Sequence, residues 1–209
     1  TGGVQEQFVL NDNIKHLTIA GGSSETFVYS IGVNETALSG IVTINGSVNG
    51  TDLNSGYITT DNTSEITDQF LVWRSATLSI YSITSENNSV STGQNSLYVT
   101  MVVRNEGDAT AGVYGAGLNF TAATGTVTGE YALQGMSNPL SIAGGMSETY
   151  IFSVAVGGGA TAGRITIDGS VSGSDLNSGY GTTDESSIVT GGWTVQRKAV
   201  LSIISVRTD

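Results

Sequence analysis

The segment Leu17-Thr-Ile-Ala-Gly-Gly-Ser-Ser-Glu-Thr26 returns later in the chain as Leu140-Ser-Ile-Ala-Gly-Gly-Met-Ser-Glu-Thr149. The segment Asp52-Leu-Asn-Ser-Gly-Tyr57 returns unchanged as Asp175-Leu-Asn-Ser-Gly-Tyr180. The offset is 123 residues without a gap, and residues 17–61 share 27 identities in 45 positions with residues 140–184. Such identity at a single offset indicates an internal duplication, so both parts of the chain are predicted to share one fold.

The register of this repeat predicts how the chain is organised. The match runs back to Val4 against Val127 and forward to Ala76–Ile80 against Ala199–Ile203. One complete period therefore covers residues 76–198, and residues 1–75 form an N-terminally incomplete repeat. Residues 199–209 form a single strand, which is either a donor strand or the start of a next repeat.

The composition favours many short strands. Hydrophobic residues make up 38% of the 209 residues, with 29 glycines and a single proline, a mix that suits strands and tight turns and gives helices little support. The net charge of −11 argues against binding to nucleic acid or to anionic membranes. The sequence contains no apolar run of about 18 residues, so no membrane insertion is expected. The absence of cysteine excludes disulfides and thiolate chemistry.

Apolar residues alternate with polar ones in several short runs, a period typical of half-buried strands. Residues 50–68 and 174–192 are instead interpreted as long polar loops. Seven or eight short strands per period predict an all-β fold of tandem immunoglobulin-like β-sandwich units. The expected inward-facing residues are Phe27, Tyr29, Ile31, Val33, Val42, Ile44, Val48, Leu97, Val99, Met101, Val103, Tyr150, Phe152, Val154, Val156, Ile165, Ile167 and Val171.

Two stretches carry a resemblance to a known family. The run Ser96-Leu-Tyr-Val-Thr-Met-Val-Val-Arg-Asn-Glu-Gly-Asp-Ala109 resembles the second strand and following turn of CARDB-type modules. Ala143-Gly-Gly-Met-Ser-Glu-Thr-Tyr150 resembles that family's glycine-containing turn before an aromatic strand. The resemblance covers most of residues 76–171 and ends after Gly173. It implies an extracellular, immunoglobulin-like, non-enzymatic module of a bacterial or archaeal cell-surface protein.

The repeated Asp/Asn loops are the candidate metal sites. Alternating carboxylate and amide oxygens beside a glycine are typical of the first half of a calcium loop, which makes calcium the one cofactor to consider. The alternative is an Asx-turn, in which the side-chain oxygen holds the backbone of a surface loop. The candidate ligands are Asp52, Asn54 and Asp61 in the first copy, and Asp175, Asn177 and Asp184 in the second.

Six Asn-x-Ser/Thr sequons are candidate glycosylation sites, and modification at any of them would require a secreted glycoprotein. The alternative is that they occur by chance. The six asparagines are Asn34, Asn45, Asn49, Asn62, Asn87 and Asn119.

Four aromatic side chains could stack on sugars, although aromatics near strand ends more often pack in a core or at its rim. The candidates are Trp73, Trp193, Tyr57 and Tyr180. Support for catalysis is weak, because His16 is the sole histidine and a nucleophile needs a base beside it. The carboxylate pair Glu106 and Asp108 lies in a turn and is interpreted as solvated. We expect no enzymatic activity.

The favoured function is a structural module of an extracellular filament or cell-surface array that assembles head-to-tail with copies of itself. A unit without its opening strand exposes a sheet edge that an added strand could cover. The proposed assembly strand contains Leu201, Ile203 and Val206, with Leu201, Ile203 and Ser205 expected to face inward. The first copy lacks about three strands and one donated strand replaces one, so it is either a reduced sandwich or a piece of a longer array. The alternative function is a calcium-dependent adhesion or carbohydrate-binding module with glycans as partners.

Overall fold

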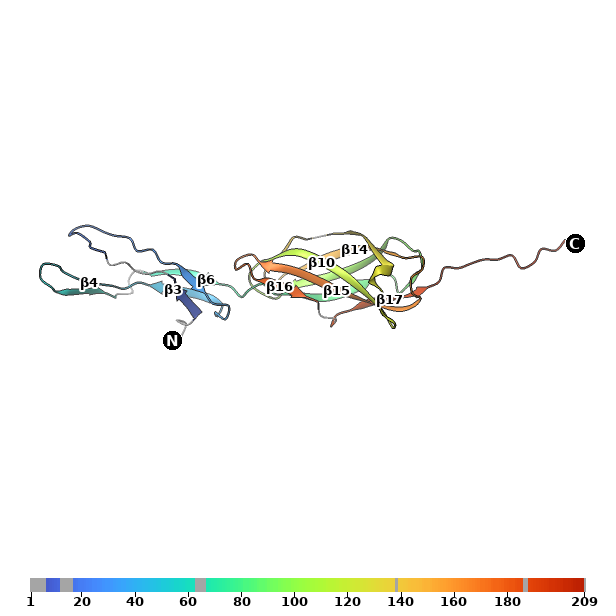
Figure 1. The fold of residues 1–209 in the computed structure, drawn as a ribbon, viewed down its shortest axis with the longest axis horizontal. Helices are drawn as coiled ribbons and strands as arrows, with labels where there is room; N and C mark the ends of the chain where they lie inside the picture. Colours follow the sequence, from blue (N-terminus) through green and yellow to red (C-terminus); the bar gives the residue numbers. More distant parts are fainter. Residues whose placement is uncertain (1–6, 12–16, 63–66, 138, 186–187, 209) are drawn as a thin grey trace. The chain divides into compact units, whose positions relative to one another are not determined.

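The computed structural model describes residues 7–11, 17–62, 67–137, 139–185 and 188–208 (Figure 1). The chain divides into two compact units, unit 1 at Thr1–Arg74 and unit 2 at Ser75–Asp209. Apart from one short 3-10 turn, η2 (Thr128–Glu130), every regular element in the described residues is a β-strand, which confirms the all-β prediction. No helix in these ranges is long and apolar enough to span a bilayer.

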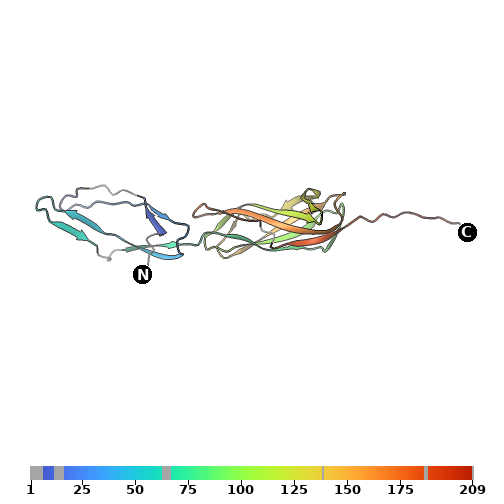
Figure 2. The ribbon, with the colours of Figure 1, turned by 60° about the horizontal axis from the view of Figure 1, so that its bottom comes forward.

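Unit 2 is built from two sheets that pack face to face as a sandwich, and Figure 2 shows its strands in two layers. The first sheet has the strand order β12 (Tyr131–Met136), β14 (Ser147–Val156), β9 (Leu97–Asn105) and β7 (Leu78–Ser85). The second has the order β11 (Gly125–Thr126), β10 (Ala111–Ala122), β15 (Gly163–Asp175), β17 (Gly191–Gln196) and β8 (Ser89–Ser91), with β13 (Ser141–Ile142) beside β10 and β16 (Gly181–Asp184) beside β15.

The core of unit 2 follows from the period-two pattern of its long strands, because alternate side chains point into the space between the sheets. The predicted inward residues of β9, β14 and β15 are all buried, which confirms that part of the prediction. At one end of the core the rings of Phe120 and Tyr131 stack with centroids 4.2 Å apart, and Trp193 lies 5.8 Å from Phe120.

In its described residues, unit 1 has three antiparallel pairs of strands. These pairs are β1 (Phe8–Leu10) with β2 (Ile31–Val33), β3 (Gly40–Asn45) with β6 (Thr67–Val72), and β4 (Val48–Thr51) with β5 (Ile58–Asp61). The pairs β3–β6 and β4–β5 have the register that unit 2 shows 123 residues later. For example, Val48 faces Asp61 as Val171 faces Asp184, and Val42 faces Phe70 as Ile165 faces Trp193.

The two units differ in burial at corresponding positions of identical sequence. Val171 is 0% exposed, whereas its counterpart Val48 is 52% exposed. The difference arises because the part of unit 1 that the structure describes has no second sheet to cover this face. The predicted strand over residues 27–33 forms only at Ile31–Val33, and Tyr29 is exposed. That prediction was wrong in extent, since isolated strand pairs are marginal without a covering layer.

The loop prediction needs correction, whereas the assembly strand stays a prediction. The long loops predicted at residues 50–68 and 174–192 contain the hairpin strands β5 and β16 and the first residues of β6 and β17. The assembly strand predicted at Leu201, Ile203 and Val206 has no strand pairing in the described residues. Its extended backbone follows β17 without a sheet partner (Figure 1).

Candidate functional site

The opening strand of unit 2, β7, lies at the edge of its sheet and pairs with β9 on one side. On the other side, side chains from β15 and β16 accept its backbone N–H groups. Ala76 N donates to Asp175 Oδ2 at 2.7 Å, and Leu78 N donates to Thr182 Oγ1 at 2.9 Å. Ile80 N donates to Asp184 Oδ2 at 2.7 Å. We call Asp175, Thr182 and Asp184 the polar seam, because they join the edge of one sheet to the other sheet.

The polar seam provides acceptors for the backbone N–H groups that an edge strand leaves without a partner strand. An unpaired row of N–H groups is costly when it is buried and attracts foreign strands when it is exposed. The spacing fits, since N–H groups on one edge of a strand recur at every second residue. The seam therefore satisfies the edge of β7 with side chains in place of another strand.

Asp175 also builds the turn that starts the β15–β16 hairpin. Its Oδ1 accepts the backbone N–H groups of Asn177 at 2.7 Å and Ser178 at 2.8 Å, which is the Asx-turn alternative raised from the sequence. Burial acts to raise the pKa of the Asp175 carboxyl, but hydrogen bonds from the N–H groups of Ala76, Ser178 and Asn177 outweigh it. The pKa therefore lies below its ordinary value, and Asp175 is a charged acceptor at neutral pH.

These contacts bear on the predicted calcium ligands. Asp175 and Asp184 direct carboxylate oxygens at backbone N–H groups, and Asn177 contributes a backbone N–H group to the turn. In the described residues no group of three or more His, Cys, Asp or Glu side chains is arranged to hold a metal ion. Calcium binding at Asp52, Asn54, Asp61 and their counterparts stays a prediction.

Two glycines of β15 form the floor on which β7 packs. A Cβ atom placed on Gly173 would lie 2.9 Å from Leu78 Cδ1, and one on Gly169 would lie 3.1 Å from Ile80 Cδ1. The same atom on Gly169 would lie 3.0 Å from Ile83 Cδ1. The closest obstacles come from other strands, since a Cβ on Gly173 would first meet the carbonyl oxygen of Gly112 in β10 and one on Gly169 would lie 2.6 Å from Met101 Sδ in β9. Glycine is required at these positions because neighbouring strands, β7 among them, fill the space around them.

An irregularity in β7 decides which of its residues face this floor. The pairing with β9 shifts register between Ile80 and Ser82, so that Ile83 is buried and Ser82 is only partly covered. At the corresponding positions of the C-terminal segment, Val206 takes the place of Ile83 and Ser205 that of Ser82. Val206 therefore matches an inward residue of β7 better than Ser205 does, and the expectation that Ser205 faces inward does not follow from β7.

A buried asparagine holds the adjacent end of the sandwich together. The Nδ2 atom of Asn105 donates to the carbonyl oxygens of Ala109 at 2.8 Å and Ile142 at 3.0 Å. Its Oδ1 accepts from Thr77 N at 3.1 Å and Gly107 N at 3.0 Å. A single side chain thus satisfies four backbone groups from the start of β7, the turn after β9 and β13. The turn Asn105-Glu-Gly-Asp-Ala109, which ends the run Ser96–Ala109 that carries the family resemblance, therefore has a structural role here.

Unit 1 carries the same set of residues. Asp52, Thr59 and Asp61 correspond to the three residues of the polar seam, and Gly46 and Gly50 correspond to the two floor glycines. Asp52 Oδ1 accepts the N–H groups of Asn54 at 2.7 Å and Ser55 at 3.0 Å, as Asp175 does in its own turn. These bonds, the one from Ser55 first, lower the pKa of Asp52 below its ordinary value.

Among the residues that the structure describes, none fills the space above the floor of unit 1. A Cβ atom placed on Gly46 would meet nothing within 4 Å, and one on Gly50 would meet only Thr59 Cγ2, at 4.0 Å. Unit 1 also has an apolar groove of about 410 Å³ that is lined by Phe8, Leu10, Ile31, Val42, Thr43, Ile44, Asn45 and Phe70. The counterparts of Phe8 and Phe70 in unit 2 are Tyr131 and Trp193, against which Phe120 packs.

The remaining candidates lie apart from the seam. The sequon residues Asn34, Asn45, Asn49, Asn62 and Asn119 are exposed and Asn87 is half-buried, so glycosylation stays a prediction for them. Trp193 lies in the core at 3% exposure, and its proposed role as a sugar platform is wrong.

The exposed aromatics Trp73, Tyr57 and Tyr180 stay predictions as sugar platforms. In the turn after β9, Glu106 Oε1 lies 3.4 Å from Arg104 Nε on the surface. His16 lies outside the described residues.

The polar seam could not be read from strand patterns alone, since its acceptors lie about a hundred residues from the strand they bind. The available signal was the repeat itself. Asp52, Thr59 and Asp61 lie in the stretch that the two copies share almost unchanged, DLNSGYITTD at 52–61 and DLNSGYGTTD at 175–184.

No protein-family model matches this chain, and neither does any curated protein. Among solved structures, the periplasmic chaperone SfaE is similar over 55% of this chain, at 14% sequence identity and a TM-score of 0.30. The match spans 58% of that chaperone. A likeness at this level carries no inference about function.

Proposed function

We propose that this chain is a non-enzymatic structural module of an extracellular filament or cell-surface array, in which copies assemble head-to-tail. Units 1 and 2 are tandem copies of one immunoglobulin-like unit of the CARDB type. Their shared strand registers and the 27 identities in 45 positions support this interpretation. The exposed sequons fit an extracellular location.

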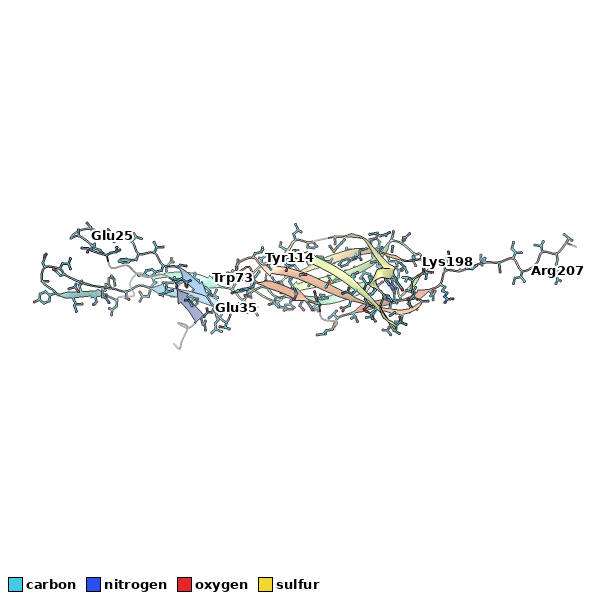
Figure 3. The ribbon with its side chains drawn as sticks, viewed as in Figure 1. Glu25, Glu35, Trp73, Tyr114, Lys198 and Arg207 are labelled. Carbon is cyan, nitrogen blue, oxygen red and sulfur yellow. The ribbon has the colours of Figure 1, made fainter. Side chains whose placement is uncertain are left out.

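A single observation carries the proposal. The segment Ala199-Val-Leu-Ser-Ile203 repeats the start of β7, Ala76-Thr-Leu-Ser-Ile80. Leu78 is 3% exposed in the sandwich, whereas its counterpart Leu201 is 97% exposed. Figure 3 shows the side chains between the labelled Lys198 and Arg207 projecting from an extended backbone. The β7 sequence is thus repeated in a segment that lies outside the sandwich of unit 2.

A contact between one end of a chain and a different surface of the next chain does not close, and it therefore produces a filament. The test is electron microscopy of the chain beside a variant that lacks residues 199–209. We expect filaments from the first and single particles from the second. Single particles from both would refute the proposal.

A further inference from the structure

We propose that unit 2 binds a uronic acid residue of an acidic glycan in a hollow on the outer face of its second sheet. The hollow has a volume of about 390 Å³, at the lower end of the roughly 300–1,000 Å³ of small-ligand sites. Its polar lining includes Asn88, Arg164, Thr166, Thr190, Gly192 and Thr194. The site belongs to unit 2 alone and does not depend on filament assembly.

The hollow arises from a glycine at an outward position of β17. Strands β15 and β17 lie side by side (Figure 1) and pair Arg164 with Thr194 and Thr166 with Gly192. Because side chains alternate across a strand and Trp193 is buried in the core, Gly192 and Thr194 face away from the core. Side chains therefore surround a position at which β17 itself contributes none.

Unit 1 shows what takes this place when the glycine is replaced. Thr43 faces Gln69 there as Thr166 faces Gly192 in unit 2. The Gln69 side chain reaches across the strand pair, and its Nε2 donates to Thr43 Oγ1 at 3.2 Å. The threonine at this position thus accepts from a polar group that lies over the sheet. In unit 2 the glycine supplies no such group, so a bound ligand can supply it.

The charge of the hollow comes from Arg164. In the part of the chain that the structure describes, this guanidinium makes no ion pair. The corresponding residue in unit 1 is Ile41, so the charge is a feature of unit 2. An arginine can bind a carboxylate through two parallel N–H bonds. The net charge of −11 opposes anions in general, so affinity for a carboxylate depends on this single guanidinium.

The remaining groups of the hollow suit a sugar ring. Three threonine hydroxyls and the amide of Asn88 can each donate and accept hydrogen bonds, as the hydroxyls of a pyranose require. Asp168 is the next outward residue of β15 after Thr166 and repels a carboxylate from that end of the hollow. The carboxylate of the ligand therefore points to Arg164 and its hydroxyls to the threonines. A uronic acid carries both kinds of group on one ring, whereas an acidic peptide side chain carries only the carboxylate.

The test uses full-length variants that borrow residues from unit 1. Arg164→Ile removes the charge and Thr194→Leu fills part of the hollow. Unit 1 has Ile41 facing Leu71 at these two positions of the same strand pairing, so the strands of unit 2 should accept both changes. The matched control is Arg104→Ile, which removes the same charge from the surface of the other sheet. Urea unfolding checks that each variant remains folded.

Digalacturonic acid is titrated into each protein, and the amide signals of Gly191 and Gly192 are followed by NMR. We expect saturable shifts with the unmodified chain and with Arg104→Ile. Binding should be at least about tenfold weaker with Arg164→Ile, because a charge-assisted hydrogen-bonded pair is lost. Thr194→Leu should also weaken binding, since the new side chain takes space from the ligand.

Two other probes identify the ligand class. Galactobiose, which has no carboxylate, should bind at least about tenfold more weakly than digalacturonic acid. Equal binding of the two sugars would overturn the role of Arg164. N-acetylglutamate should also bind more weakly, and equal binding by it would overturn the sugar in favour of an acidic peptide. If digalacturonic acid causes no saturable shift at Gly191 or Gly192, the site itself is refuted, whether or not the chain forms filaments.

Discussion

The polar seam makes a quantitative prediction for Asp175→Ala in unit 2. The substitution removes the acceptor of three backbone N–H groups, those of Ala76, Asn177 and Ser178. The N–H of Ala76 is buried, and a buried donor left without a partner costs about 1–3 kcal/mol. Water can reach the other two N–H groups more easily, so each adds about 0.5 kcal/mol. The free energy of unfolding should fall by about 3 kcal/mol.

The measurement is urea unfolding followed by the fluorescence of Trp193, which lies in the core of unit 2. A Trp73→Phe background leaves Trp193 as the sole tryptophan of the two in the chain. With a urea dependence of about 1.5 kcal/mol per molar, the midpoint should fall by about 2 M. Thr182→Val removes a single acceptor, that of Leu78, and should lower the midpoint by about half as much.

The matched control is Asp52→Ala, which makes the same change in the turn of unit 1. Asp52 is exposed, and its substitution should leave the Trp193 transition where it is. An unchanged midpoint for Asp175→Ala would refute the reasoning, because the bonds to β7 would then contribute nothing. Equal losses from Asp52→Ala and Asp175→Ala would also contradict it, since the effect would belong to the turn and not to the seam.

Three further predictions concern unit 2 and the paired Asp loops. Gly144→Ala should lower the free energy of unfolding, measured in urea, by about 2–3 kcal/mol, because the new Cβ would meet the backbone of Asp108. The control Gly159→Ala places its Cβ where no described atom lies within 4 Å, so the free energy of unfolding should change by less than about 0.5 kcal/mol. The folded-state pKa of Asp175 is lowered, so its stabilisation is present above the unfolded value of about 3.9 and is lost as the pH falls through the lower folded value. Unfolding midpoints measured from about pH 6 downward should therefore fall less steeply in Asp175→Asn than in the unmodified chain. Millimolar calcium, or its removal by a chelator, should leave the thermal midpoint unchanged if the carboxylates act only on the backbone, and a rise with calcium would support the metal prediction instead.

The sequence correctly predicted the strands of unit 2 in which apolar and polar residues alternate, because there the buried positions are the apolar ones. Leu97, Val99, Met101 and Val103 alternate with polar neighbours, and all four are buried because sheets cover both sides of the core. The same pattern in unit 1 predicted a strand through Phe27 and Tyr29 that the structure does not form. A period of two identifies a face that can be buried, but burial also needs a second layer, which a local pattern does not reveal.

The candidate site was predictable in its residues and not in its chemistry. Asp175 and Asp184 stood out because alternating acidic and amide oxygens are typical ligands of calcium. In the structure the same side chains accept N–H groups from Ala76 and Ile80. Both uses require an oxygen acceptor beside a sharp turn, so the local sequence cannot separate them. The two uses differ in whether a backbone with free N–H groups lies opposite the carboxylates. In this protein that backbone belongs to β7 and the residues just before it, about a hundred residues earlier in the chain.

The manner in which β7 is held has a consequence for assembly. In ordinary strand addition, a main-chain ladder supplies the affinity and tolerates most sequences. The polar seam instead offers three separate side-chain acceptors above a floor of two glycines. Such a site selects a segment with apolar residues at alternate positions and discriminates against bulky or charged ones facing the floor.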